Sequence, residues 1–109
     1  MNKNQQKFYK LGKINHNMRL NDKVAIVTGA SSDIGKGIAK KFVEEGAKVI
    51  LVARNLEGLE KARKEIGNED ATVSIPCDLT DESQALQAVN QIMDTYGKID
   101  ILVNNAGAI

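Results

Sequence analysis

The sequence is poor in cysteine, histidine and aromatic residues. It has one cysteine (Cys77), one histidine (His16) and no tryptophan in 109 residues. A lone cysteine excludes an intrachain disulfide, and one Cys with one His excludes a zinc site built from these ligands. Lack of disulfides is typical of a reducing compartment, so we expect a cytoplasmic protein without a bound metal. We interpret Cys77 as a small buried residue, because no basic neighbour in the sequence would activate its thiol.

Long apolar runs and a large net charge are also absent. No run approaches the roughly 20 apolar residues of a membrane span, and the N-terminus lacks the apolar segment of a signal peptide. The net charge of +1 gives no reason to expect a nucleic-acid or membrane partner. Residues 1–17 contain four lysines, no acidic residue and no apolar period. We therefore predict a disordered tail or start-site artefact over 1–17, and a domain over 18–109.

From Lys23 onward the sequence alternates between strand-like and helix-like patterns, which is typical of an α/β protein with a parallel sheet. The predicted strands cover residues 23–28, 48–53, 72–76 and 101–104. Right-handed crossovers then give a partial, doubly wound Rossmann-type sheet with four strands in the order 3-2-1-4. Of the three predicted helices, the first two would lie on one face and the third on the other.

Capping residues and glycines delimit these helices. The first is expected over about 34–45, the second after an Asn55 cap, and the third after a Thr80 cap. Gly46, Gly67 and Gly97 supply the helix ends. The third helix has an apolar stripe predicted to face the sheet, formed by Leu86, Val89, Ile92, Met93 and Tyr96.

A short glycine-containing loop joins the first strand to the first helix. Gly29 permits a sharp turn after the strand, and Gly35 lets the helix backbone approach either a ligand or the first strand. Backbone N–H groups at a helix N-terminus are unpaired and carry partial positive charge, which suits a phosphate. The alternative is a purely structural strand-to-helix turn. We favour a dinucleotide site, because the loop lies between a strong strand and a strong helix.

Three motifs resemble the short-chain dehydrogenase/reductase family. Thr28-Gly29-Ala30-Ser31-Ser32-Asp33-Ile34-Gly35 resembles its TGxxxGxG fingerprint, Asp78-Leu79 matches after the third strand, and Asn104-Asn105-Ala106-Gly107 matches after the fourth. The resemblance spans Met18 to Ile109. It implies a Rossmann fold and an oxidoreductase that binds NAD(P). Within this family the chain is similar in general character to 3-oxoacyl-carrier-protein reductases and glucose dehydrogenases.

The resemblance implies cofactor contacts in the loop from Gly29, Ser31, Ser32, Asp33, Ile34 and Gly35. Asp33 stands where the family has its middle glycine. A carboxylate beside a pyrophosphate would repel it. We favour the alternative that Asp33 caps the first helix, accepting a hydrogen bond from the N–H of Gly35 or Lys36. Replacing Asp33 with glycine is expected to tighten dinucleotide binding.

The end of the second predicted strand indicates which dinucleotide binds. In this fold an acidic residue there binds the ribose 2′-hydroxyl of NAD, whereas this chain has Ala53 followed by Arg54. A guanidinium can pair with the 2′-phosphate of NADP. We therefore predict that NADP(H) is the cofactor, with NAD(H) as the alternative. If Arg54 has no part in binding, it is a solvated charge in a loop.

Two further contacts are implied by the resemblance alone. Asp78, with Leu79 beside it, would accept a hydrogen bond from the adenine amino group. The segment Asn104, Asn105, Ala106 and Gly107 would border the adenine ribose and brace the middle of the sheet.

The family's catalytic residues, a Ser and a Tyr-x-x-x-Lys, lie beyond the fourth strand. The match from Tyr9 to Lys13 falls in the polar tail and is rejected as chance. No catalytic residue is thus expected, and the chain is interpreted as the NADP(H)-binding half of an oxidoreductase acting on a carbonyl or alcohol, inactive by itself. A non-catalytic binding module and an inactive truncated product are the alternatives. A homo-oligomer is left open for the intact protein.

Overall fold

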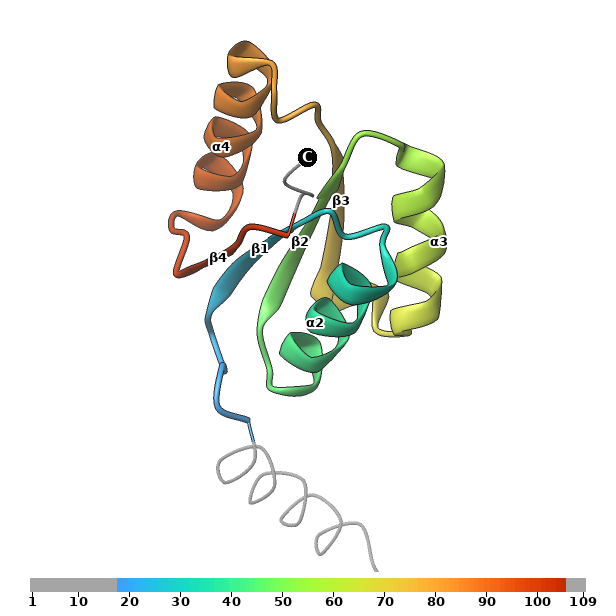
Figure 1. The fold of residues 1–109 in the computed structure, drawn as a ribbon. Helices are drawn as coiled ribbons and strands as arrows, with labels where there is room; N and C mark the ends of the chain where they lie inside the picture. The colour runs from blue at the N-terminus through green and yellow to red at the C-terminus, as the bar shows by residue number, and fades with distance from the viewer. Residues whose placement is uncertain (1–17, 106–109) are drawn as a thin grey trace, which may run out of the picture.

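The computed structural model describes residues 18–105. The predicted tail over 1–17, and the predicted site residues Ala106 and Gly107, lie outside this range. The described chain alternates strands and helices (Figure 1). In chain order the elements are β1 (Val24–Thr28), α2 (Asp33–Glu44), β2 (Lys48–Ala53), α3 (Leu56–Ile66), the 3₁₀ turn η1 (Glu69–Ala71), β3 (Thr72–Pro76), α4 (Glu82–Tyr96) and β4 (Ile101–Val103).

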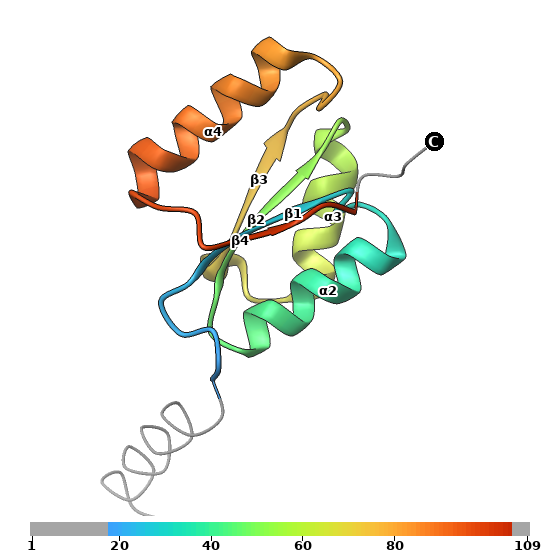
Figure 2. The same cartoon turned by 60° about the vertical axis from the view of Figure 1, so that its left-hand side comes forward.

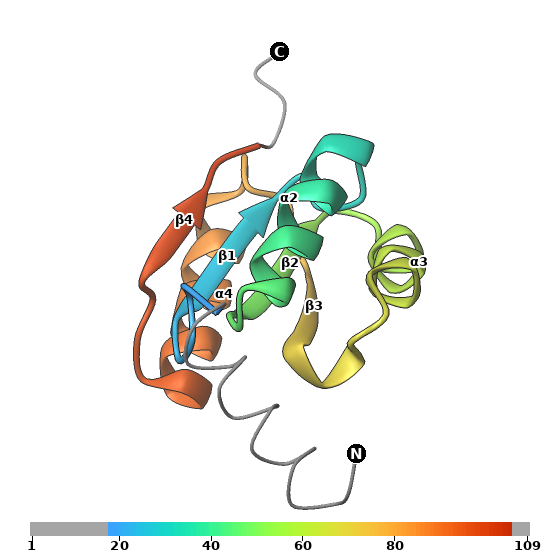
Figure 3. The same ribbon diagram turned by 90° about the horizontal axis from the view of Figure 1, so that it is seen from below.

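The four strands form one parallel sheet in the order β3-β2-β1-β4, as Figure 3 shows, so the predicted order is confirmed. Register places Ile26 of β1 between Ile50 of β2 and Leu102 of β4. All four strands run in the same direction, so their carboxyl ends meet at one edge of the sheet. In open α/β sheets, ligands bind outside this edge.

Each face of the sheet has its own apolar core. Helices α2 and α3 cover one face, where Val27, Val49 and Leu51 are buried against Ala39 and Leu59. Helix α4 lies on the other face (Figure 2), where Ile92 packs with buried residues of β1, β2 and β3. The predicted distribution of helices over the two faces is confirmed. β1 and β2 are buried on both faces, which is why their sequences are almost continuously apolar.

The predicted apolar stripe of α4 is only partly right. Ala88 and Ile92 are the buried residues of this helix, and Tyr96 packs against the same core. Leu86, Val89 and Met93 instead are between 41% and 60% exposed. A spacing of four residues places Ala88, Ile92 and Tyr96 on one side of the helix, and this side packs on the sheet. The larger residues at 86, 89 and 93 flank that side and are exposed.

Helix ends follow the predicted glycines more closely than the predicted caps. Asn55 caps α3 as expected, with its side chain accepting a hydrogen bond from the N–H of Gly58 at 3.1 Å. The prediction for α4 was one residue early, because Asp81 rather than Thr80 accepts the hydrogen bond from Gln84. The Thr80 hydroxyl is used elsewhere, since it donates to Asp78 at 2.7 Å.

Candidate functional site

The loop after β1 is held by its own backbone. Gly29 has a φ of 61°, a left-handed conformation that glycine adopts at little cost. Its carbonyl accepts hydrogen bonds from the backbone N–H of Ser32 at 3.1 Å and from the Ser32 hydroxyl at 2.8 Å. The N–H of Ala30 donates to Val52 of β2 at 3.2 Å, which fixes the start of the loop to the neighbouring strand.

Ser32, and not Asp33, caps α2. Ser32 has an extended backbone conformation, and its hydroxyl accepts the hydrogen bond from the N–H of Gly35 at 3.1 Å. The prediction that Asp33 is the cap was therefore wrong. Asp33 is the first helical residue, and its fully exposed carboxylate lies 3.5 Å from the Nζ of Lys36. There its negative charge is favourable to the helix dipole.

Two backbone N–H groups remain available at this helix start. Within residues 18–105, the N–H groups of Asp33 and Ile34 donate to no protein acceptor. The Ile34 side chain beside them is 71% exposed. Two adjacent free donors at the positive end of a helix can bind an anion, and one face of that site is lined by an apolar side chain.

Gly35 is required by contact with the first strand. A Cβ at Gly35 would lie 2.3 Å from the carbonyl oxygen of Gly29 and 2.9 Å from Nδ2 of Asn105. Of the two predicted reasons for this glycine, approach to the end of β1 is therefore observed. The close packing brings the start of α2 directly against the turn.

The end of β4 is tied to the same loop. The backbone N–H of Asn105 donates to Oγ1 of Thr28 at 2.8 Å, and its Nδ2 donates to the Ser32 hydroxyl at 3.2 Å. The Thr28 hydroxyl is in turn within donating distance of the carbonyl of Val103, at 3.2 Å, and of Oδ1 of Asn104, at 3.3 Å. Asn105 thus braces the glycine loop, whereas the sequence predicted that this segment would brace the middle of the sheet and border the ribose. Thr28 begins the fingerprint motif but was not predicted as a site residue, although a polar residue at the end of a buried apolar strand was the available signal.

A cleft of about 340 Å³ opens beside the loop at the carboxyl ends of β1, β2 and β3. The predicted residues Gly29, Ser31, Arg54, Asp78 and Leu79 all line it. Arg54 is exposed and follows β2 directly, while Leu79 is partly exposed after β3. The topology thus brings together residues separated by up to 50 positions in the sequence.

Asp78 is fixed as an ionised acceptor in this cleft. Both the hydroxyl and the backbone N–H of Thr80 donate to its Oδ1, at 2.7 and 3.0 Å. These hydrogen bonds, assisted by the positive charge of Arg54, lower the pKa of Asp78 below its ordinary value. Gln84 accepts from the Asp78 backbone N–H at 2.9 Å. Among residues 18–105, Oδ2 of Asp78 has no protein donor.

Other candidate chemistry in the described part of the chain is limited. Cys77 is buried, as predicted, and burial raises the pKa of its thiol. No three His, Cys, Asp or Glu side chains between residues 18 and 105 are grouped to hold a metal ion. Over the same residues, none of the helices has the length and apolar character needed to span a membrane.

This combination of a parallel sheet, a glycine loop and a cleft at the carboxyl strand ends defines a Rossmann-type dinucleotide-binding fold. The family model for short chain dehydrogenase matches residues 23–109, and the chain belongs to this family. The resemblance stated from its motifs is thereby confirmed.

Three known proteins illustrate the relationship. A fatty acyl-CoA reductase of Acinetobacter baylyi is 49% identical over 86 residues, which cover 78% of this chain and 29% of the reductase. A crystal structure of a metagenomic short-chain oxidoreductase in complex with NADP superposes with a TM-score of 0.76 at 39% identity, covering 82% of this chain and 41% of that one. For 3-ketoacyl-(acyl-carrier-protein) reductase of Brucella melitensis, complexed with NADH, the TM-score is 0.74 at 44% identity, with 81% and 35% covered.

The chain spans 28% to 38% of the length of the curated relatives it matches, among them oxidoreductases of several kinds. The similar structures include complexes with NADP and with NADH. Membership of an NAD(P)-binding oxidoreductase family is therefore shown.

Proposed function

We propose that this chain is the NADP(H)-binding part of a short-chain oxidoreductase that acts on a carbonyl or alcohol substrate. The observation that carries the proposal is Arg54, an exposed guanidinium at the end of β2 that lines the same cleft as Gly29 and Asp78. No acidic residue stands at the end of β2 to repel a 2′-phosphate. The similarity to proteins bound to NADP and to NADH supports a dinucleotide without choosing between the two.

The described residues fit the parts of such a cofactor. The free N–H groups of Asp33 and Ile34 suit the pyrophosphate, as donors at a helix start. Arg54 would pair with the 2′-phosphate through charge-assisted hydrogen bonds. Oδ2 of Asp78 would accept from the adenine amino group, and Asn105 with Asn104 would border the ribose. When bound, the nicotinamide supplies or accepts hydride.

These residues bind and orient, and none of them is proposed to move a proton. Thr80 and Gln84 hold Asp78, and Asn105 holds the loop, through hydrogen bonds within the described chain. We propose no catalytic residue among the 109. The expected rate of hydride transfer by this chain alone is zero in an assay with carbonyl and alcohol substrates. Measured turnover would overturn this assignment.

The preference for NADP is tested at Arg54. The free energies of binding of NADP⁺ and NAD⁺ are measured by calorimetry for the wild-type chain and for Arg54→Gln. Loss of a charge-assisted pair at an exposed site should weaken NADP⁺ binding by about tenfold. Binding of NAD⁺ should change by less than about twofold, since it lacks the 2′-phosphate.

Arg19→Gln is the matched control. Arg19 lies before β1, and its backbone N–H is bonded to Glu45, far from the carboxyl ends of the strands. This variant should leave both dissociation constants unchanged. Equal affinity of the wild-type chain for NADP⁺ and NAD⁺ would contradict the NADP preference, and absence of binding to either would contradict the whole proposal.

A further inference from the structure

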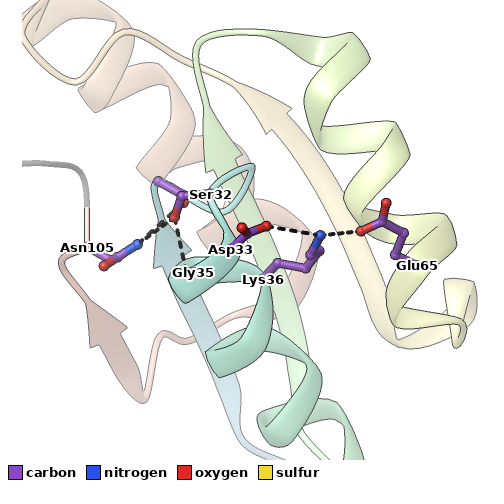
Figure 4. Close-up of polar contacts among 7 residues, drawn as sticks. Ser32, Asp33, Gly35, Lys36, Glu65 and Asn105 are labelled. Carbon is purple, nitrogen blue, oxygen red and sulfur yellow. Dashed lines mark hydrogen bonds and ion pairs between the residues drawn. The ribbon is translucent and has the colours of Figure 1, made fainter.

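Asp33 places a negative charge at the helix start where the pyrophosphate is proposed to bind. Its carboxylate is directed toward the α3 side of the loop, whereas Asn105 contacts the loop from the β4 side (Figure 4). The side chain is fully exposed and makes its ion pair with Lys36, at 3.5 Å between Oδ1 and Nζ. Within residues 18–105, neither of the two free N–H groups is bonded to this carboxylate.

Lys36 is itself anchored across the helix interface. Its Nζ forms a hydrogen-bonded ion pair with Glu65 near the end of α3, 29 residues further along the chain. The Lys36 side chain is 28% exposed, less than either of its two acidic partners. The hydrogen bond with Glu65 is the main cause that raises the pKa of Lys36, and the charge of Asp33 acts in the same direction. The same bond lowers the pKa of Glu65.

The pairing with Lys36 reduces the repulsion expected between the Asp33 carboxylate and a bound diphosphate. Like charges within a Debye length of about 8–10 Å repel each other at ordinary salt concentrations. A cation fixed close to the carboxylate reduces the field that reaches a bound diphosphate. A freely moving lysine would do this less well, because it would spend much of its time in solvent.

We infer that Lys36, anchored by Glu65, is a positioning residue for dinucleotide binding: it holds the Asp33 carboxylate on the α3 side of the loop and offsets its charge. This inference rests on the proposed dinucleotide site. It assigns Lys36 no contact with the cofactor. The effect of Lys36 on dinucleotide affinity therefore requires that Asp33 is charged.

A double-mutant cycle tests that requirement. Lys36→Met is introduced into the wild-type chain and into Asp33→Asn, which keeps the shape of the side chain and removes its charge. Dissociation constants for NADP⁺ and NAD⁺ are measured by calorimetry at low and high salt. In the wild-type background, Lys36→Met should weaken both dinucleotides by about threefold to fivefold, in line with exposed ion pairs, and less so at high salt. In the Asp33→Asn background the change should be less than about twofold.

Two further variants complete the experiment. Glu65→Gln releases the anchor but also removes one negative charge from the same cluster, so it should weaken binding in the wild-type background by less than Lys36→Met does. Lys40→Met removes an exposed lysine from the same helix and should have no effect. Thermal unfolding of each chain without cofactor separates binding effects from loss of stability.

The outcomes distinguish the inference from the site on which it rests. Equal weakening by Lys36→Met in both backgrounds would mean that Lys36 contacts the phosphates or merely stabilises α2, and would overturn the inference while leaving the site intact. Failure of the wild-type chain to bind either dinucleotide would overturn both.

Discussion

Replacing Gly35 with alanine tests the geometry on which the candidate site depends. The new Cβ would lie 2.3 Å from the carbonyl oxygen of Gly29 and 3.0 Å from its carbonyl carbon. Both are backbone atoms of a turn that is fixed to Ser32 and followed directly by the Ala30–Val52 hydrogen bond. The turn or the start of α2 must therefore move, because no side-chain rotation relieves the contact.

The magnitude follows from two opposing effects. Overpacking at a close contact costs about 1–3 kcal/mol, whereas alanine in place of glycine gains up to about 1 kcal/mol of helix propensity. We expect a net loss of about 1–2 kcal/mol in the free energy of unfolding. Gly37 provides the matched control, since it lies in the same helix and a Cβ there meets no atom within 4 Å. Gly37→Ala should stabilise the chain by about 0.5–1 kcal/mol.

Thermal and urea unfolding without cofactor measure the first effect, and calorimetric titration with NADP⁺ measures the second. For a domain of this size, Gly35→Ala should lower the Tm by roughly 5–15 °C. Its affinity for NADP⁺ should also fall, because the free N–H groups of Asp33 and Ile34 are displaced, while Gly37→Ala should bind as the wild type does. If the two variants were equally stable and bound equally well, the close approach of α2 to β1 would be refuted.

Two other predictions concern hydrogen bonds that hold the fold. Asp100 accepts from the N–H of Val24 at 2.8 Å, and this bond, helped by Lys98, lowers its pKa. Its contribution is present above the ordinary aspartate pKa and is lost as pH falls through the lowered one. Asp100→Asn should therefore destabilise the chain at pH 7, and in urea unfolding the difference from wild type should begin to shrink below about pH 4 and vanish only below the lowered pKa. Ser32→Ala removes the α2 cap and should cost about 1 kcal/mol, whereas Ser31→Ala should change stability by less than about 0.5 kcal/mol.

The sequence predicted most of the scaffold because its local signals agree with the global fold. The predicted bounds of β2 and β3 match those observed, and the others differ by one residue. Right-handed crossovers left a single sensible strand order once the alternation of strands and helices was recognised. The outward turn of Leu86, Val89 and Met93 was not predictable in this way. Apolar residues occur on more than one side of α4, and periodicity does not say which side packs closest to the sheet.

The errors in the caps have a related cause. Ser31, Ser32 and Asp33 are all good capping residues, as are Thr80 and Asp81, so composition locates each helix start only to within a residue. That single residue decides the electrostatics of the site. As a cap, Asp33 would have accepted a hydrogen bond from the N–H of Gly35 or Lys36, whereas as the first helical residue its carboxylate pairs with the Lys36 side chain and Ser32 caps the helix. The Lys36–Glu65 pair could not be predicted from the sequence either, because it depends on how α2 packs against α3.

In the loop between β1 and α2, the residues that determine the shape differ from the residues that carry charge. Gly29, Gly35 and Asn105 fix its shape through contacts with one another and with Ser32. A loop that is held by its own contacts has little ordering to do when it binds, so differences in affinity should reflect mainly charge. The charged side chains at the loop are Asp33 and Lys36. Their ion pair is exposed and contributes little to the free energy of unfolding. Shape variants should thus lower stability and affinity together, whereas charge variants should alter affinity and its salt dependence alone. Asp33, where this chain departs from the family fingerprint, is a charge position, so its variants should alter affinity and not stability.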